Sequence, residues 1–276
     1  MRIKLSLLAV FAFVLFAFVV GVVDATAQTA PFQPTPGQPG KDVVWVPTPA
    51  ELVEKMLDMA KVTPEDIVID LGSGDGRNVI AAARRGARAF GFEFNPEMVA
   101  LSRRLAEEAG VSERATFIEG DMYEADISKA TVLALFLLPS NLDKLAPKFL
   151  ALKPGTRIVN NTFAVTGWEP DESEKVEGSC TSWCTGLLNI VPAQAAGTWR
   201  LGSNDLTLTQ DFQNVTGTLG TNPVAGGRLS GEQITFKVGE TAYTGRITGN
   251  RMQGVATTAG KEEKWSAMRN GPAATR

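Results

Sequence analysis

The strongest chemical signal in the sequence is a glycine-rich turn that follows an acidic residue. Residues 68–76 read VIDLGSGDG, so Asp70 stands near the end of an apolar run and glycine occupies every second position from Gly72. Glycine adopts backbone conformations that a Cβ penalises, and it lets the main chain approach a ligand closely. A second apolar run ends at Glu93, 21 residues after Gly72, about where α/β cofactor folds place a ribose-binding carboxylate. The sequence therefore predicts a nucleotide-like cofactor site.

The spacing of the glycines indicates which cofactor this is. Dinucleotide-binding turns follow the pattern G-x-G-x-x-G, whereas this turn ends at Gly76 and continues with Arg77. An acid followed by G-x-G-x-G, without a further glycine to bring helix and strand together, favours S-adenosylmethionine over a cofactor that contains pyrophosphate. The alternative is a glycine turn that only serves the fold, but the strand, turn and helix around the motif favour a cofactor site.

This block resembles motif I of the class I S-adenosylmethionine-dependent methyltransferases. More narrowly, several segments look like bacterial relatives of the mitochondrial protein-lysine methyltransferases, and the resemblance spans about residues 41–192. The segments are WVPTP at 45–49, DLGSGDGR at 70–77, GFEFNP at 91–96, FIEGDM at 117–122, LFLLPS at 135–140 and LKPG at 152–155. Motif I is specific for the cofactor, and none of the segments fixes the substrate.

The resemblance assigns roles on the cofactor side. Asp70 fixes the glycine loop and reaches the amino group of the cofactor, while Glu93 accepts hydrogen bonds from both ribose hydroxyls, one at each carboxylate oxygen. Asp121, with Met122 beside it, occupies the position that holds the adenine amino group; the alternative for Asp121 is an acid that caps its own loop. The methionine and sulfonium part is wrapped by Gly72, Ser73, Gly74 and Gly76.

The methyl-acceptor side is predicted to be an aromatic, proline-walled channel. Trp45 and Pro47 precede an expected helix, and residues 136–140, which include Pro139, end the strand whose tip faces the transferred methyl group in this fold. A lysine ammonium rests against Trp45 in this interpretation, and the alternative is a tryptophan that is simply buried. Attack requires the neutral amine, whose free pKa is about 10.4, so the channel must desolvate it and release its proton to water. Candidate orienting residues are Thr48, Asn160 and Asn161.

The sequence departs from the resemblance at two positions. The similar bacterial proteins often carry tyrosine where Phe136 stands and histidine near Asn161, and this chain has neither. Cofactor binding is unaffected by these differences, whereas substrate identity and turnover stay open. The alternatives to an amine methyltransferase are a small-molecule or lipid methyltransferase and a non-catalytic S-adenosylmethionine-binding module.

Composition excludes several enzyme classes. The 276 residues include no histidine, which removes the usual general base and the Ser-His-Asp and Cys-His nucleophile systems. A methyltransferase is still compatible with this composition, because attack on a sulfonium methyl carbon depends on positioning more than on a strong base. Residues 28–196 carry 16 Lys and Arg against 23 Asp and Glu. This balance disfavours nucleic acid and suits a protein lysine or a small amine; the alternative is ordinary solubility charge.

The two cysteines, Cys180 and Cys184, are spaced C-x-x-x-C. In an exported protein they form a local disulfide that stabilises the fold modestly, and the alternative is a pair of free or buried thiols. Structural zinc needs four ligands, and a chain without histidine offers no convincing set, so no metal is expected.

The first 27 residues are interpreted as an export signal. Arg2 and Lys4 precede an apolar run over residues 5–23, and an A-x-A cleavage site follows at residues 25–27. The run is also long enough to span a bilayer, so an uncleaved membrane anchor is the alternative. Either interpretation places the catalytic domain outside the cytoplasm, as a periplasmic, secreted or membrane-anchored enzyme. S-adenosylmethionine is made in the cytosol, so a catalytic domain outside the cytoplasm needs another source of cofactor. The sequence leaves this conflict open.

Two folded domains are expected after a linker. Residues 28–40 contain four prolines and no charge, which predicts an extended linker. Residues 41–192 alternate between strands and helices at the lengths of a parallel α/β sheet, a Rossmann-like methyltransferase fold. Residues 197–271 show short alternating segments with glycine turns, which predict six to eight antiparallel strands in a small β-barrel or sandwich. This β domain is either a stabilising appendage or a substrate-recruiting module.

In the α/β domain, strands are expected at 67–71, 89–93, 115–119, 131–137 and 157–163, and helices at 49–59, 78–85, 96–109 and 141–150, the first of them capped by Thr48. The prediction as a whole is an exported S-adenosylmethionine-dependent methyltransferase that N-methylates an amine such as that of a protein lysine.

Overall fold

The structure is a computed structural model that describes residues 32–178 and 180–271. The predicted signal or anchor at residues 1–27 and the first part of the predicted linker lie outside the described residues. Within those residues, no helix has both the length and the hydrophobicity that crossing a membrane requires.

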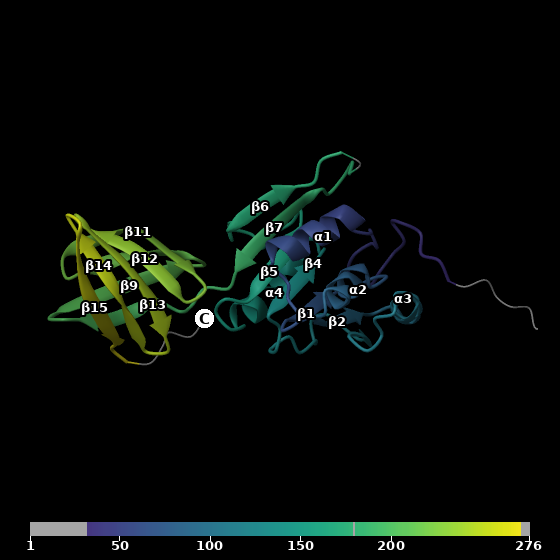
Figure 1. The fold of residues 1–276 in the computed structure, drawn as a ribbon, viewed down its shortest axis with the longest axis horizontal. Helices are drawn as coiled ribbons and strands as arrows, with labels where there is room; N and C mark the ends of the chain where they lie inside the picture. Colours follow the sequence, from purple (N-terminus) through teal and green to yellow (C-terminus); the bar gives the residue numbers. More distant parts are fainter. Residues whose placement is uncertain (1–31, 179, 272–276) are drawn as a thin grey trace, which may run out of the picture. The chain divides into compact units, whose positions relative to one another are not determined.

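The first domain contains a seven-stranded mixed sheet (Figure 1). Its strands are β1 (Ile67–Leu71), β2 (Arg88–Glu93), β3 (Ala115–Glu119), β4 (Val132–Leu135), β5 (Arg157–Asn161), β6 (Glu172–Lys175) and β7 (Thr185–Ile190). They lie in the order β3-β2-β1-β4-β5-β7-β6, with the first five parallel and β7 antiparallel to both of its neighbours. The carboxyl ends of β1, β2 and β4 therefore meet at one edge of the sheet.

The four helices of this domain divide its core in two. They are α1 (Ala50–Met59), α2 (Arg77–Arg84), α3 (Pro96–Glu108) and α4 (Pro139–Leu150). Successive side chains of a strand point to opposite faces; accordingly, Val68 packs with the apolar residues of α1, α2 and α3, while Ile69 packs with those of α4. In β4, Val132 likewise packs in the core half that contains α1, α2 and α3, and Leu133 packs in the half that contains α4. This alternation buries the strands on both faces, as a parallel sheet requires.

Several predicted boundaries in this domain are wrong. The β6–β7 hairpin was not expected; the strand expected at 131–137 covers only Val132–Leu135, and that expected at 157–163 ends at Asn161. Helix α4 begins at Pro139, two residues earlier than predicted, because proline favours the first helical position. Thr48 does not cap α1: Pro49 is the N-cap residue, without a side-chain cap hydrogen bond. The Thr48 hydroxyl instead accepts a hydrogen bond from Asn161 Nδ2 at 3.3 Å.

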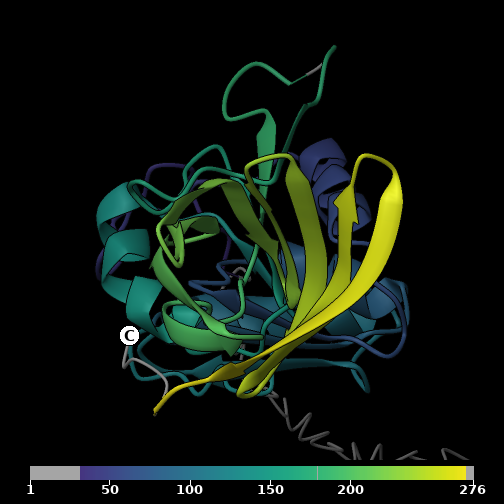
Figure 2. The same ribbon diagram turned by 90° about the vertical axis from the view of Figure 1, so that its left-hand side faces the viewer.

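The second domain is a closed antiparallel barrel of eight strands (Figure 2). The strands are β8 (Gly197–Leu201), β9 (Asn204–Asp211), β10 (Asn214–Leu219), β11 (Asn222–Ser230), β12 (Gln233–Val238), β13 (Thr241–Thr248), β14 (Arg251–Thr258) and β15 (Lys261–Arg269). Closure comes from pairing of β15 with β8, which places Arg269 opposite Trp199. The prediction of a Rossmann-like sheet followed by a small all-β domain is confirmed, and its barrel form is the correct alternative.

Candidate active site

The glycine turn between β1 and α2 is held by backbone hydrogen bonds to the neighbouring strand. The N–H groups of Gly72 and Ser73 both donate to the Phe92 carbonyl, at 2.8 and 3.0 Å. Gly72 and Gly74 have φ values of +72° and +55°, which side chains with a Cβ rarely adopt. A Cβ at residue 74 would lie 2.6 Å from Trp45 Nε1. The turn therefore exposes main chain to a cleft that Trp45 also lines.

Gly76, predicted to wrap the cofactor, lies outside the cleft lining. It is the N-cap residue of α2, with φ +81°, and a Cβ there would lie 2.5 Å from the Phe117 ring. Gly91 on β2, the first residue of the GFEFNP segment, permits a second close approach, because a Cβ there would lie 2.6 Å from Ser73 Oγ. These two glycines bring helix, turn and strand together, while Gly72 and Gly74 face the cleft.

Glu93 ends β2 and fixes two backbone segments at once. Its Oε2 accepts a hydrogen bond from the Gly74 N–H and its Oε1 accepts one from the Asn95 N–H, both at 2.9 Å. Each oxygen of a carboxylate has about two acceptor positions, so one remains on each for a further donor. The side chain is only partly buried and lines the cleft. This arrangement fits a ligand with two vicinal hydroxyl donors.

Asp70 is 3% exposed at the base of the cleft. Burial raises the pKa of its carboxyl group well above the ordinary value, and the neighbouring charges of Glu93 and Asp75 raise it further. A hydrogen bond from Asn78 Nδ2 at 3.1 Å acts in the opposite direction. A cationic ligand group near this carboxyl would favour its ionised form, so the position fits the ammonium that the resemblance assigns to it.

Asp121 is held by a lysine that precedes α1. Lys41 Nζ forms an ion pair with the Asp121 carboxylate and lies 4.7 Å from the centroid of the Phe94 ring. The hydrogen bond from Lys41 lowers the pKa of Asp121, and the Tyr123 N–H, which donates to the same carboxylate at 2.9 Å, lowers it further. Asp121 thus also caps its own loop, which was the alternative interpretation. Lys41, Phe94 and Met122 all line the cleft, and sequence reasoning missed the first two.

The cleft as a whole fits S-adenosylmethionine. Its lining includes five carboxylates and two basic side chains, a balance that suits a cofactor bearing a sulfonium and an ammonium group. The buried hydroxyl of Ser73 has no hydrogen-bond partner among the described residues, and such groups are normally satisfied. Of the predicted cofactor residues, those that line the cleft are Asp70, Gly72, Ser73, Gly74, Glu93, Asp121 and Met122.

The acceptor side of the cleft is more aromatic than predicted. Trp45, Pro47, Thr48 and Phe136 line it, whereas Pro139, the first residue of α4, does not. Asn160 and Asn161 are buried and lie outside the lining, so they do not directly orient a substrate in this arrangement. Two further rings, Phe163 and Trp183, join Phe136, with ring centroids 6.3 and 6.1 Å from it. No sequence periodicity marks these two residues.

Comparison with known proteins agrees with this geometry. A family model described as the ANTKMT methyltransferase domain matches residues 70–172. A protein-lysine N-methyltransferase of Saccharolobus islandicus (strain REY15A) is 46% identical over 138 residues, which cover 49% of this chain and 86% of that protein. The adenine nucleotide translocase lysine N-methyltransferase of Mus musculus is 38% identical over 130 residues, covering 46% of this chain and 56% of that protein. The chain thus spans little more than half of the mouse relative.

A solved structure of an RNA methyltransferase from Salinibacter ruber, in complex with S-adenosyl-L-homocysteine, is also similar. It is 46% identical with a TM-score of 0.50, and the match covers 53% of this chain and 94% of that one. Fold, cleft and relatives together define a class I S-adenosylmethionine-dependent methyltransferase. Within that class, the chain belongs to the family that contains the Saccharolobus lysine methyltransferase and the ANTKMT methyltransferase domain.

Glu93→Ala should weaken S-adenosylmethionine binding about 100-fold or more. The substitution removes the acceptor for the ribose hydroxyls, one restraint on the turn at Gly74 and one on the segment before α3 at Asn95. Hydrogen bonds to charged groups contribute about 1.5–3 kcal/mol each. Calorimetric titration of the chain from Gln28 with S-adenosylmethionine and with NAD measures this. Glu119→Ala is the matched control, because Glu119 pairs with Glu93 in register on the adjacent strand but does not line the cleft. Equal affinity in both variants, or tighter binding of NAD, would contradict the assignment.

The unfolding free energy should fall with pH more steeply in the wild type than in Asp70→Asn. A carboxyl whose folded pKa is raised contributes stability below its unfolded pKa, about 3.9, and this contribution is lost as pH rises through the folded pKa. The slope from one such group reaches about 1.4 kcal/mol per pH unit. Urea unfolding of both proteins, from about pH 4 upward, measures the difference.

Asp126→Asn provides a control of opposite sign. Backbone hydrogen bonding from Ser128 lowers the pKa of Asp126, so its contribution is present above the unfolded pKa and is lost as pH falls. Identical slopes for wild type and Asp70→Asn would show that Asp70 ionises normally.

Proposed function

We propose that this methyltransferase methylates the side-chain amine of a protein lysine. The observation that carries the proposal is the aromatic wall formed by Phe136, Phe163 and Trp183 beside the cofactor turn. Such a wall accommodates a long aliphatic side chain that ends in a cationic or neutral amine. The lysine methyltransferases among the relatives support the same substrate class.

In this reaction the chain's residues bind the cofactor and desolvate the incoming amine. When bound, S-adenosylmethionine would supply a methyl carbon on sulfonium sulfur for attack by the neutral amine, with S-adenosylhomocysteine as the leaving group. Trp45 and the glycine turn limit access to the cofactor position, and Glu93 and Asp70 hold its polar groups. The partly buried rings of Phe136 and Phe163 exclude water from the incoming amine and so disfavour its charged form, whose free pKa is about 10.4. Because the chain has no histidine, the proton passes to water.

Nucleic acid is the competing substrate class, since the similar Salinibacter protein is an RNA methyltransferase. Phosphate binding depends on Lys and Arg, yet residues 28–196 carry 16 basic against 23 acidic side chains. Within the cleft the described basic side chains are Lys41, which pairs with Asp121, and Arg77, which pairs with Asp75. This charge distribution supports a protein substrate over RNA.

Labelled methyl groups should therefore appear on lysine Nε. The purified chain from Gln28 is incubated with methyl-labelled S-adenosylmethionine and, separately, with a protein extract, an RNA extract and a panel of small amines. Amino-acid analysis after acid hydrolysis should recover methyllysine from the protein arm, and Glu93→Ala should abolish this signal, while Glu119→Ala retains it. Label in nucleosides, or in small amines alone, would contradict the proposal, and cofactor binding without transfer in every arm would support a non-catalytic module.

We further propose that the enzyme works outside the cytoplasm after cleavage before Gln28. The support is the predicted signal at residues 1–27 together with a disulfide between Cys180 and Cys184, a bond typical of oxidising compartments. Expression of the full chain in a bacterium should yield a periplasmic protein whose mass corresponds to residues 28–276. Ala27→Arg, which disrupts the cleavage site, should leave the chain in the membrane fraction. A full-length cytosolic wild-type protein would contradict the proposal.

A further inference from the structure

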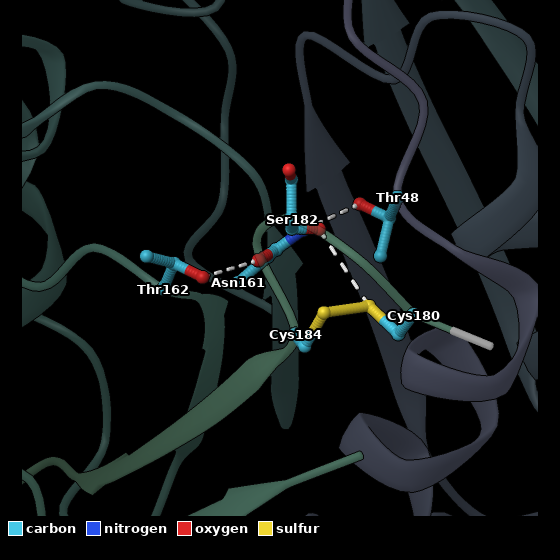
Figure 3. Close-up of a disulfide and its surroundings, with 6 residues drawn as sticks. All are labelled: Thr48, Asn161, Thr162, Cys180, Ser182 and Cys184. Carbon is cyan, nitrogen blue, oxygen red and sulfur yellow. Dashed lines mark hydrogen bonds between the residues drawn. A yellow bond between two sulfur atoms is a disulfide. The ribbon is translucent and has the colours of Figure 1, made fainter. Parts of the chain in front are cut away.

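The loop between β6 and β7 carries a small covalent ring (Figure 3). Cys180 and Cys184 form a disulfide across four positions of sequence. The ring is joined to the strands around it, because the Val176 N–H donates to the Cys184 carbonyl at 2.8 Å. Cys184 is 8% exposed, whereas Thr181 is exposed to solvent. The ring therefore has one fixed side and one solvent-facing side.

Trp183 is the residue inside this ring that faces the cleft. Its side chain is 44% exposed, although large apolar side chains are normally buried. Its φ is +53°, in the left-handed region that is unfavourable for bulky residues. An exposed ring on strained backbone does not contribute to a core, and strain of this kind concentrates at ligand sites. Its neighbour is Phe136, 6.1 Å away at an interplanar angle of 56°.

A second strained turn brings Phe163 to the same place. At the end of β5, Thr162 has φ +60°, and the Phe163 N–H donates to the Asn161 carbonyl at 2.6 Å, which closes a three-residue turn. The Thr162 N–H donates to the Thr185 carbonyl at 2.7 Å, directly after the disulfide ring. Phe163 stacks on Phe136 at 6.3 Å. The rings thus come from three separate segments and are linked through β5 and β7.

We propose that Trp183, held in place by the Cys180–Cys184 disulfide, is a specificity-determining wall of the acceptor channel and contacts the cationic end of lysine and methyllysine side chains. The inference rests on the proposed lysine specificity. An indole face attracts ammonium groups, and the attraction persists after methylation because the charge remains. The partial exposure of Trp183 leaves its ring available to an incoming peptide.

The test measures binding of defined probes to the oxidised chain from Gln28, saturated with S-adenosylhomocysteine. The probes are N-acetyl-lysine methylamide, its Nε-trimethyl form and the neutral N-acetyl-norleucine methylamide. Their affinities are measured by NMR titration. Trp183→Ala should weaken binding of the trimethyl probe about five- to thirtyfold, the range of a partly to fully desolvated cation–π contact. The same substitution should weaken binding of the norleucine probe by a smaller factor. Trp183→Phe should bind the trimethyl probe more tightly than Trp183→Ala does.

The double variant Cys180→Ser/Cys184→Ser should behave like Trp183→Ala, because it releases the tryptophan without removing it. Thr181→Ala is the matched control in the same ring and should bind the probes as the wild type does. Every variant should keep the wild-type affinity for S-adenosylmethionine, which reports that the domain is folded.

Different outcomes separate this inference from the proposed function. Equal binding of the trimethyl probe by wild type and Trp183→Ala would overturn the role of Trp183 and leave lysine methylation standing. If Trp183→Ala weakens binding of the cationic and neutral probes by the same factor, the proposed contact with the cation is overturned. If the wild type binds S-adenosylmethionine but neither lysine probe, the lysine assignment fails, and this inference fails with it.

Discussion

The two hydrogen bonds accepted by the Glu93 carboxylate are the interaction on which the cofactor cleft depends. One binds the turn after β1 through the Gly74 N–H, and the other binds the residue before α3 through the Asn95 N–H. The carboxylate thus fixes two cleft walls that are about 20 residues apart in sequence while keeping an acceptor position free on each oxygen. This arrangement requires β1 and β2 to be parallel neighbours, as they are. The close passage of Gly91 beneath Ser73 makes it sterically feasible.

The residues that line the cofactor half of the cleft were largely predictable from sequence because their determinants are local. A strand, a glycine turn and a helix must follow one another for the motif to form, and the carboxylate at Glu93 ends the next strand. The exception is Gly76, whose glycine is required by the Phe117 ring packed against it and not by the cofactor. Such a contact joins residues 41 positions apart, and a motif read along the chain does not contain it.

The acceptor half was predicted less well, and the reason is physical. Strand β6 has the sequence Glu172–Lys175, with no apolar alternation, and it is a strand only because β7 pairs with it. The hairpin, and Trp183 with it, is therefore defined by tertiary pairing. Barrel closure is a similar case: alternation predicted the strands, but the choice between barrel and sandwich depends on whether β15 reaches β8. That pairing joins the two ends of the domain.

The disulfide has a local function that its size explains. In the chain-entropy view, a closed loop of five residues restricts the unfolded chain by only about 2 kcal/mol, against about 4.7 kcal/mol for a loop of 100 residues. A bulky residue in the left-handed region costs about 1–3 kcal/mol, so the two quantities are comparable. The ring thus offsets the backbone strain at Trp183 and contributes little to the domain as a whole. A covalent link of this size is suited to fixing one side chain at the edge of a cleft, where the Trp183 ring contacts Phe136 but stays 44% exposed.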